Sequence, residues 1–264
     1  MYEFEYQRPT NRVAAKTAAT GDTRYLAGGQ SLIQAMRLRL SQSARLVDLG
    51  AVADLKGIKA ENGGVTIGAM ATHASVASNA DVKRLIPALA ELAAGIGDPM
   101  VRNMGTIGGS IANADPAACY PAAVLALGAT IHTDQRTIKA DAFFTGLYET
   151  ALLPGELVTA VSFPAAAKAA YVKFKQPASR FALVGVFVAQ TPGGIRVAVT
   201  GAKSSVFRAT AIETALANAF TAAAAKSVKM PTDDINSDLH GSAEYRAAMI
   251  SVIASRAVSA ALAR

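Results

Sequence analysis

Two pairs of adjacent glycines are the residues of this chain whose types and spacing suit the binding of a phosphate. The first pair, Gly28-Gly29, lies between a predicted strand at 24–26 and a predicted helix at 31–40. A backbone without Cβ atoms can approach a ligand closely. The amides that begin a helix have no partner of their own, and the helix dipole favours an anion there. Taken alone, the pair also fits an ordinary turn. The predicted binding segment is Ala27, Gly28, Gly29, Gln30, Ser31 and Leu32.

A second glycine pair makes a larger ligand the better hypothesis. Gly108-Gly109 lies in a predicted loop, 104–116, that also carries hydroxyl, amide and carboxylate side chains. Open amides and short hydroxyls suit phosphate oxygens, and a carboxylate can accept hydrogen bonds from sugar hydroxyls. Two such segments could hold a pyrophosphate from both sides, which predicts a dinucleotide site. The residues selected here are Thr106, Ile107, Gly108, Gly109, Ser110, Asn113 and Asp115.

Other catalytic arrangements are missing from the sequence. We find no serine–histidine–acid set, no paired carboxylates at catalytic spacing and no P-loop. The Gly95-Ile96-Gly97 stretch closes a predicted helix and does not open one after a strand, so it is not a Rossmann fingerprint. The three histidines lie far apart without acidic companions, so no metal site is predicted, and His73 is assigned a structural role.

Composition sets limits on the class of protein. The chain has 264 residues, of which 52% are hydrophobic and 17% charged, which describes a packed globular protein. The single cysteine, Cys119, excludes internal disulfides and a cysteine-ligated iron–sulfur cluster, and we expect it to be a small buried residue. The net charge of +7 is scattered and aromatic residues are few, so a solvated basic face or a docking face for an acidic partner is favoured over nucleic-acid binding. No apolar run of membrane-spanning length and no secretory signal are evident, which favours the cytoplasm.

The elements that would position the glycine segments follow from periodicity and turn residues. A short helix at 11–19 and a strand at 44–49 complete a small α/β lobe with the first glycine segment. A strand pair at 55–59 and 65–70 begins a second lobe, followed by helices at 81–96 and 121–128 and a strand at 157–163. The alanine-rich stretch 165–170 is predicted as a domain boundary. Beyond it we expect strands at 171–175, 181–189 and 195–201, with Pro192-Gly193-Gly194 forming a hairpin, and helices at 210–225 and 243–262.

With these segments placed, the chain resembles a known family. Residues 27–40 and 105–128 are similar to the FAD-binding medium subunit of molybdenum-containing hydroxylases, the carbon monoxide dehydrogenase and xanthine dehydrogenase family. Residues 67–73, 155–164 and 174–182 agree as well, and the five stretches occur in order over essentially the whole chain.

The resemblance implies an α+β fold, with a p-cresol methylhydroxylase-type, two-lobed FAD-binding domain over 1–166 (lobes at about 1–55 and 56–166). A C-terminal domain over 167–264 would have a three-stranded antiparallel sheet and helices. The family's partners would be a small subunit with [2Fe–2S] clusters and a large subunit with the molybdopterin cofactor, as a dimer of heterotrimers. Electrons would pass from the clusters through FAD to NAD, a quinone or oxygen, and the substrate would be selected on another chain.

The resemblance also implies roles for individual residues. Ala27–Ser31 and Thr106–Ser110 would hold the pyrophosphate, mainly by backbone amides. The backbone of Leu157 and Val158 would meet the pyrimidine edge of the isoalloxazine, Lys175 would place a cation near that edge, and Phe181 would screen the ring.

One departure from the family pattern leaves the function open. Cys119 stands where many relatives carry an aspartate that bonds the ribityl chain, so Asp115, a backbone group or a water would have to replace it. Two alternatives therefore stand beside the electron-transfer subunit: a structural or assembly subunit without flavin, and a stand-alone flavin reductase.

Overall fold

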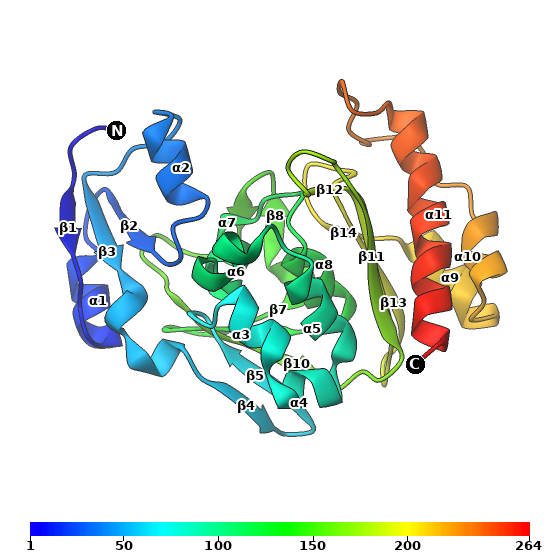
Figure 1. The fold of residues 1–264 in the computed structure, drawn as a ribbon, viewed down its shortest axis with the longest axis horizontal. Coiled ribbons are helices and arrows are strands. Elements are labelled where there is room, and N and C mark those ends of the chain that lie inside the picture. The colour runs from blue at the N-terminus through cyan, green and yellow to red at the C-terminus, as the bar shows by residue number, and fades with distance from the viewer.

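The computed structural model describes all residues from 1 to 264 and arranges them in three consecutive parts, which follow one another from one side of the molecule to the other (Figure 1). The N-terminal part is a three-stranded parallel sheet in the order β1-β3-β2, with strands β1 (Glu5–Gln7), β2 (Thr23–Leu26) and β3 (Arg45–Asp48). Parallel strands need crossover connections, and the helices α1 (Arg12–Ala18) and α2 (Leu32–Arg37) provide them. The first glycine pair therefore lies in the turn from β2 to α2, as the sequence predicts.

Helix α2 ends sooner than the prediction of 31–40. Its last helical residue is Arg37, and Arg39 has a φ of 59°, in the left-handed region that stops an α-helix. Two single-turn 3-10 segments, Leu49–Ala51 and Ala53–Leu55, then lead out of this part of the chain.

The middle part is built on a five-stranded antiparallel sheet in the order β4-β5-β10-β6-β7. Its strands are β4 (Ile58–Glu61), β5 (Gly64–Gly68), β6 (Thr130–Thr133), β7 (Thr137–Lys139) and β10 (Val158–Pro164). Six helices follow β5: α3 (His73–Ser78), α4 (Ala80–Leu85), α5 (Pro87–Ala94), α6 (Pro99–Met104), α7 (Ile107–Asn113) and α8 (Tyr120–Ala126). The short strands β8 (Phe144–Gly146) and β9 (Glu149–Thr150) pair with each other before β10.

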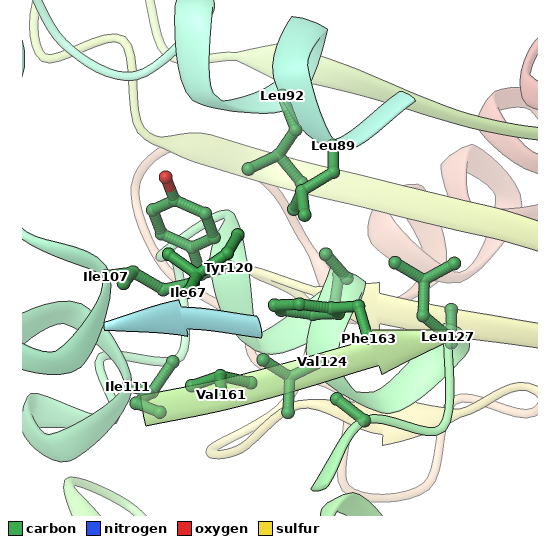
Figure 2. Packing of buried hydrophobic residues seen from close by; sticks show 14 of the residues in the cluster. Ile67, Leu89, Leu92, Ile107, Ile111, Tyr120, Val124, Leu127, Val161 and Phe163 are labelled. Atoms are coloured by element: carbon green, nitrogen blue, oxygen red, sulfur yellow. The ribbon is translucent and has the colours of Figure 1, made fainter. Parts of the chain in front are cut away.

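The largest hydrophobic core lies between this sheet and its helices. Figure 2 shows Ile67, Val161 and Phe163 of β5 and β10 gathered with Leu89 of α5 and Val124 of α8. All five side chains are 2% exposed or less. This packing fixes the positions of α3, α7 and α8, which carry residues of the site described below.

The amphipathic helix predicted over 81–96 is wrong as a single helix. The structure has two helices, α4 and α5, which meet at Ile86 and Pro87. Proline has no amide hydrogen and disfavours the helical conformation of the residue before it, and Ile86 accordingly has φ −145° and ψ 66°. The apolar stripe is nevertheless buried, because Val82, Ile86 and Leu89 are fully inaccessible.

The C-terminal part is a four-stranded antiparallel sheet in the order β11-β12-β13-β14. Three long strands, β11 (Ala169–Lys175), β12 (Ala182–Thr191) and β13 (Gly194–Thr200), correspond to the three predicted, and the two-residue strand β14 (Phe207–Arg208) extends the sheet. The helices α9 (Thr210–Asn218), α10 (Ala222–Ser227) and α11 (Ala243–Leu262) lie on its outer face (Figure 1). The prediction of one helix over 210–225 is wrong, because the chain leaves the helix at Ala219 and Thr221 caps α10.

Strand β12 is buried on both faces, which explains its nearly continuous apolar sequence. Val184, Val186 and Val188 pack with the C-terminal helices, whereas Phe187 and Ala189 belong to the core of the middle part. The C-terminal sheet is thus fastened directly to the middle part of the molecule. None of the helices combines the length and the apolar character that crossing a membrane requires.

Candidate functional site

The two glycine segments, far apart in sequence, lie against each other. A Cβ on Gly28 would collide with the carbonyl oxygen of Met104 and would lie 2.7 Å from the Cα of Gly105. Farther along, a Cβ on Gly109 would lie 3.2 Å from the Cβ of Ala27. The first segment therefore packs backbone to backbone on the start of the second, and both face the same cavity.

This cavity has a volume of about 560 Å³ and is lined by all three parts of the chain. Every residue predicted for the site lies in its wall except Ile107 and Lys175. Ile107 is fully buried in the core of the middle part. The N-terminal sheet contributes Tyr25, and the C-terminal part contributes Lys173 of β11 and Phe181 just before β12. The cavity therefore runs from the N-terminal lobe to the C-terminal sheet, past both glycine segments.

The first glycine segment offers its backbone amides to the cavity. The amides of Gly28, Gly29, Gln30 and Ser31 donate no hydrogen bond to any other group of the protein. Gly29 adopts a φ of 69°, a conformation that residues with side chains rarely take. The Ser31 side chain makes no capping hydrogen bond either, so its hydroxyl is available. A row of unpartnered N–H groups suits the oxygens of a pyrophosphate.

The second glycine segment differs from the prediction of an open loop. Residues 107–113 form helix α7, with Thr106 as N-cap, and the amides of this turn are already used. Ile107 N–H donates to Ala71 O at 3.1 Å, Gly108 N–H to Ala69 O at 2.9 Å, and Gly109 N–H to Thr106 Oγ1 at 3.1 Å. The Ser110 amide donates to Thr106 O at 3.0 Å, so the prediction that Thr106–Ser110 supplies open amides is wrong for the four residues Ile107–Ser110. What the segment offers to the cavity is the hydroxyl groups of Thr106 and Ser110.

The glycines of the second segment are required by protein packing. A Cβ on Gly108 would lie 2.5 Å from the Cβ of Ala69, inside the contact between α7 and the end of β5. Gly108 thus lets the helix lie directly on the sheet.

The wall of the cavity carries uncompensated positive charge. Arg24, Lys173 and Arg180 line it, and none of them forms an ion pair within the chain. Its two acids are Asp115 and Glu156, and Glu156 is neutralised by Arg136. The cavity therefore has an excess of positive charge, which favours an anionic ligand.

Glu156 fixes the loop that forms one side of the cavity. Its side chain is fully buried and accepts hydrogen bonds from Arg136 at 2.9 and 3.0 Å, from the Leu153 amide at 2.7 Å and from the Thr133 hydroxyl at 2.8 Å. The hydrogen bond from Arg136 is the main cause that lowers the pKa of Glu156 to about 2. Glu156 is thus a permanent anion with a structural role.

Leu157 and Val158 lie in the wall. The Leu157 backbone, which is predicted to meet the isoalloxazine edge, already makes hydrogen bonds within the protein. Leu157 N–H donates to Asp134 Oδ1 at 2.9 Å, and Leu157 O accepts from the Asp134 amide at 2.9 Å. The Leu157 side chain packs with Val47 and Leu49 of the N-terminal lobe. Its amide is therefore not free for a ring edge, and Leu157 lies at the end of the cavity away from the C-terminal sheet.

Lys173, and not Lys175, is the lysine that reaches the cavity. Its Nζ donates to Gly95 O at 2.9 Å and lies 3.4 Å from Cys119 Sγ. A register shift between Phe174 and Lys175 ends the regular alternation of β11, and Lys175 is exposed outside the wall. Cys119 is 6% exposed, as predicted for a small buried residue, and it also lies in the cavity wall.

Sequence reasoning missed several residues of the wall. Besides Lys173, the polar residues among them are Arg24, Tyr25, His73, Thr150, Glu156, Ser179 and Arg180. A signal was present for Lys173, which is a lysine within an otherwise apolar strand sequence, Tyr171-Val172-Lys173-Phe174. For the others, only the fold brings the side chain to the site.

Comparison with known proteins agrees with this architecture. Residues 2–166 match the family model described as the FAD binding domain in molybdopterin dehydrogenase. The carbon monoxide dehydrogenase medium chain of Hydrogenophaga pseudoflava is 36% identical, over 99% of this chain and 98% of its own. The nicotine 6-hydroxylase medium subunit of Paenarthrobacter nicotinovorans is 33% identical, over 92% of this chain and 91% of its own. A solved structure of carbon monoxide dehydrogenase from Hydrogenophaga pseudoflava superposes with a TM-score of 0.89, at 37% identity, over 99% of this chain and 98% of that one.

The fold and the family match define a subunit with an FAD-binding domain, and its positively charged cavity lies where the three parts of the chain meet. The chain belongs to the FAD-binding medium subunits of the carbon monoxide dehydrogenase and xanthine dehydrogenase family, which are components of molybdenum-dependent oxidoreductases.

Proposed function

We propose that this chain binds one FAD in the cavity of about 560 Å³ and transfers electrons within a molybdenum hydroxylase. The observation that carries the proposal is the row of free amides at Gly28–Ser31, which faces a cavity with three unpaired cations. A pyrophosphate carries two negative charges and many acceptor oxygens, so it satisfies both features. When bound, FAD can accept and return electrons one or two at a time.

The two ends of the cavity suit the two ring systems of FAD. At the C-terminal end, the Lys173 ammonium would stabilise negative charge on a reduced isoalloxazine, and Phe181, which is 48% exposed, would cover the ring. At the other end, Tyr25, Leu49 and Leu157 form an apolar wall for the adenine. The proposed site comprises the predicted residues without Ile107 and Lys175, together with Lys173.

A second hollow on the other side of Gly28-Gly29 is a poorer candidate for the pyrophosphate. It is lined by Arg8 and Lys56, but Arg8 pairs with Asp48 at 3.3 Å, and Lys56 Nζ donates to Gly50 O at 2.6 Å. Lys56 is thus the one cation of this hollow without an ion pair, whereas the first cavity has three, so we assign FAD to the first cavity.

The partners of the proposed complex follow from the family. A small subunit with [2Fe–2S] clusters would donate electrons to the FAD, a large subunit with the molybdopterin cofactor would select the substrate, and NAD, a quinone or oxygen would accept the electrons. The assembly would be a dimer of heterotrimers in the cytoplasm. Within this chain, we propose a division at residue 166 between the FAD-binding domain and the C-terminal domain.

The first experiment is to purify the full chain, add FAD, remove the excess and record the absorption spectrum. We expect a flavin band near ~450 nm. A chain that neither contains nor takes up FAD would be the structural subunit without flavin.

The second experiment uses an affinity-tagged chain purified from its own cells, with metal analysis of the complex. We expect two further chains and both iron and molybdenum. An unaccompanied chain that reduces an acceptor at the expense of NADH would instead be a stand-alone flavin reductase.

A further inference from the structure

His73 is a buried side chain whose hydrogen-bonding capacity is not used by the protein. It is the first residue of α3, is 5% exposed and lies in the wall of the proposed FAD cavity. Its Nδ1 atom is closed off from solvent and has no hydrogen-bond partner, whereas Nε2 also makes no hydrogen bond within the chain but is not closed off. The Nε2 edge of the ring lies against Gly105, where a Cβ would be only 2.5 Å from Nε2.

The surroundings keep the imidazole neutral. Burial, helped by the positive charge of Arg102, lowers the pKa of His73 to about 4. On the other side the ring packs on Tyr120, with centroids 5.3 Å apart. Tyr120 is the next residue in the sequence after Cys119, and the Sγ of Cys119 lies 3.4 Å from the Nζ of Lys173. No carboxylate contacts the ring, so no group of the protein favours its charged form.

A packing role alone does not account for a histidine here. A neutral imidazole carries one donor and one acceptor nitrogen, and leaving either unpaired in a buried site costs free energy that an apolar ring of similar size avoids. Nε2 is the ring nitrogen that a ligand in the cavity can reach, because it is unpartnered and, unlike Nδ1, is not closed off.

We propose that His73 positions the bound flavin nucleotide by a hydrogen bond between its neutral imidazole and a hydroxyl group of the ribityl chain. The inference rests on the proposed function, because it needs FAD in this cavity. A hydroxyl both donates and accepts, so it satisfies either tautomer without introducing charge. The pyrophosphate is the less suitable partner, since the free amides of Gly28–Ser31 and the unpaired cations already provide for it.

The first test compares His73→Phe with wild type in the full chain. Phenylalanine keeps a ring against Tyr120 but removes both nitrogens. We expect FAD, followed by quenching of its fluorescence, to bind about threefold to tenfold more weakly. The melting temperature without FAD should be unchanged or higher, because an unpaired polar group has been removed. His240→Phe, at an exposed loop position, should alter neither quantity.

These two measurements separate a ligand contact from a structural role. A lower melting temperature of the FAD-free His73→Phe chain, combined with wild-type FAD affinity, would overturn the proposal.

The second test observes the imidazole directly by NMR of the chain labelled with ¹⁵N-histidine. There are only three histidines, His73, His132 and His240, so substitution assigns each signal. On addition of FAD at pH 6, we expect the ring nitrogens of His73 to shift while keeping the pattern of a neutral ring. The proposal is contradicted if FAD binds and the ring nitrogen signals of His73 do not shift. It is also contradicted if FAD converts the ring to imidazolium, as contact with a phosphate would. If FAD does not bind wild type at all, it is the proposed function that fails.

Discussion

At the scale of single residues, glycine has two different uses in this site. Gly29 supplies a left-handed backbone conformation, with φ 69°, in the row of free amides. Gly28 and Gly108 instead allow backbone contacts inside the protein, with Met104 and with Ala69. The sequence suggests that both pairs make space for a ligand. Their packing shows that two of these glycines make space for the protein itself.

Gly28→Ala should therefore lower both stability and FAD occupancy. The new methyl group would collide with the Met104 carbonyl and force the two glycine segments apart, at a cost of about 1–3 kcal/mol. Urea unfolding and the ratio of bound flavin to protein measure the two effects. Gly57→Ala is the matched control, because nothing lies within 4 Å of the added atom and its φ is ordinary. Wild-type stability of Gly28→Ala would refute the close contact.

Lys173 and Lys175 form a natural comparison for the proposed ring position. Removing the Lys173 ammonium by substitution with methionine should make the reduced flavin less favourable and lower its two-electron potential, by about 30 mV for each 1.4 kcal/mol lost. Lys175→Met should leave the potential unchanged, since Lys175 is outside the cavity wall. Potentials can be measured by dye-coupled reduction. If Lys175→Met lowered the potential and Lys173→Met left it unchanged, Lys175 would be the lysine beside the flavin ring.

At the scale of elements, the capping of each helix decides which hydrogen-bonding groups of its first turn are free to bind a ligand in the cavity. Thr106 caps α7 and withdraws the amide of Gly109 from the site, whereas Ser31 at the start of α2 makes no such bond. Two glycine pairs of similar sequence therefore offer different groups, amides from the first and hydroxyls from the second. The loop before β10 depends in turn on one ion pair, between the buried carboxylate of Glu156 and the partly exposed guanidinium of Arg136.

The pH dependence of stability should reveal that ion pair. The folded-state pKa of Glu156 is about 2, below the ordinary 4.5, so its contribution is fully present above pH 4.5 and is lost as the pH falls toward 2. Glu156→Gln should be less stable than wild type at pH 7, and its free energy of unfolding should change less between pH 4.5 and 2. Urea unfolding at a series of pH values measures this. Parallel curves for the two proteins would show that the pair does not couple to folding.

At the scale of the whole molecule, the cavity exists only where the three parts meet. Tyr25 comes from the N-terminal sheet, Thr106 and Ser110 from the middle part, and Lys173 from the C-terminal sheet. A ligand that touches all three stabilises their mutual arrangement. The middle and C-terminal parts are already joined through Phe187 and Ala189 of β12.

FAD should therefore raise the melting temperature of the full chain more than FMN does. FAD at about a hundred times its dissociation constant adds about 2.7 kcal/mol, which for a chain of this size corresponds to roughly 5–10 °C; FMN at the same concentration should add less because it binds more weakly. FMN lacks the adenosine half and reaches only part of the cavity. Differential scanning calorimetry with each ligand makes the comparison. Equal shifts for FAD and FMN would mean that the site is not one for a dinucleotide.

The sequence by itself determined the glycine segments, the small α/β lobe, the three long C-terminal strands and the resemblance to the family, because these depend on local backbone requirements and on hydrophobic periodicity. It overlooked the helix break at Pro87, although that signal was local. Only the tertiary structure decided which amides stay free, which lysine reaches the cavity and that His73 lacks a partner. Each of these depends on contacts between residues far apart in the chain, such as Ile107 with Ala71 and Lys173 with Gly95, and no spacing within one segment encodes them.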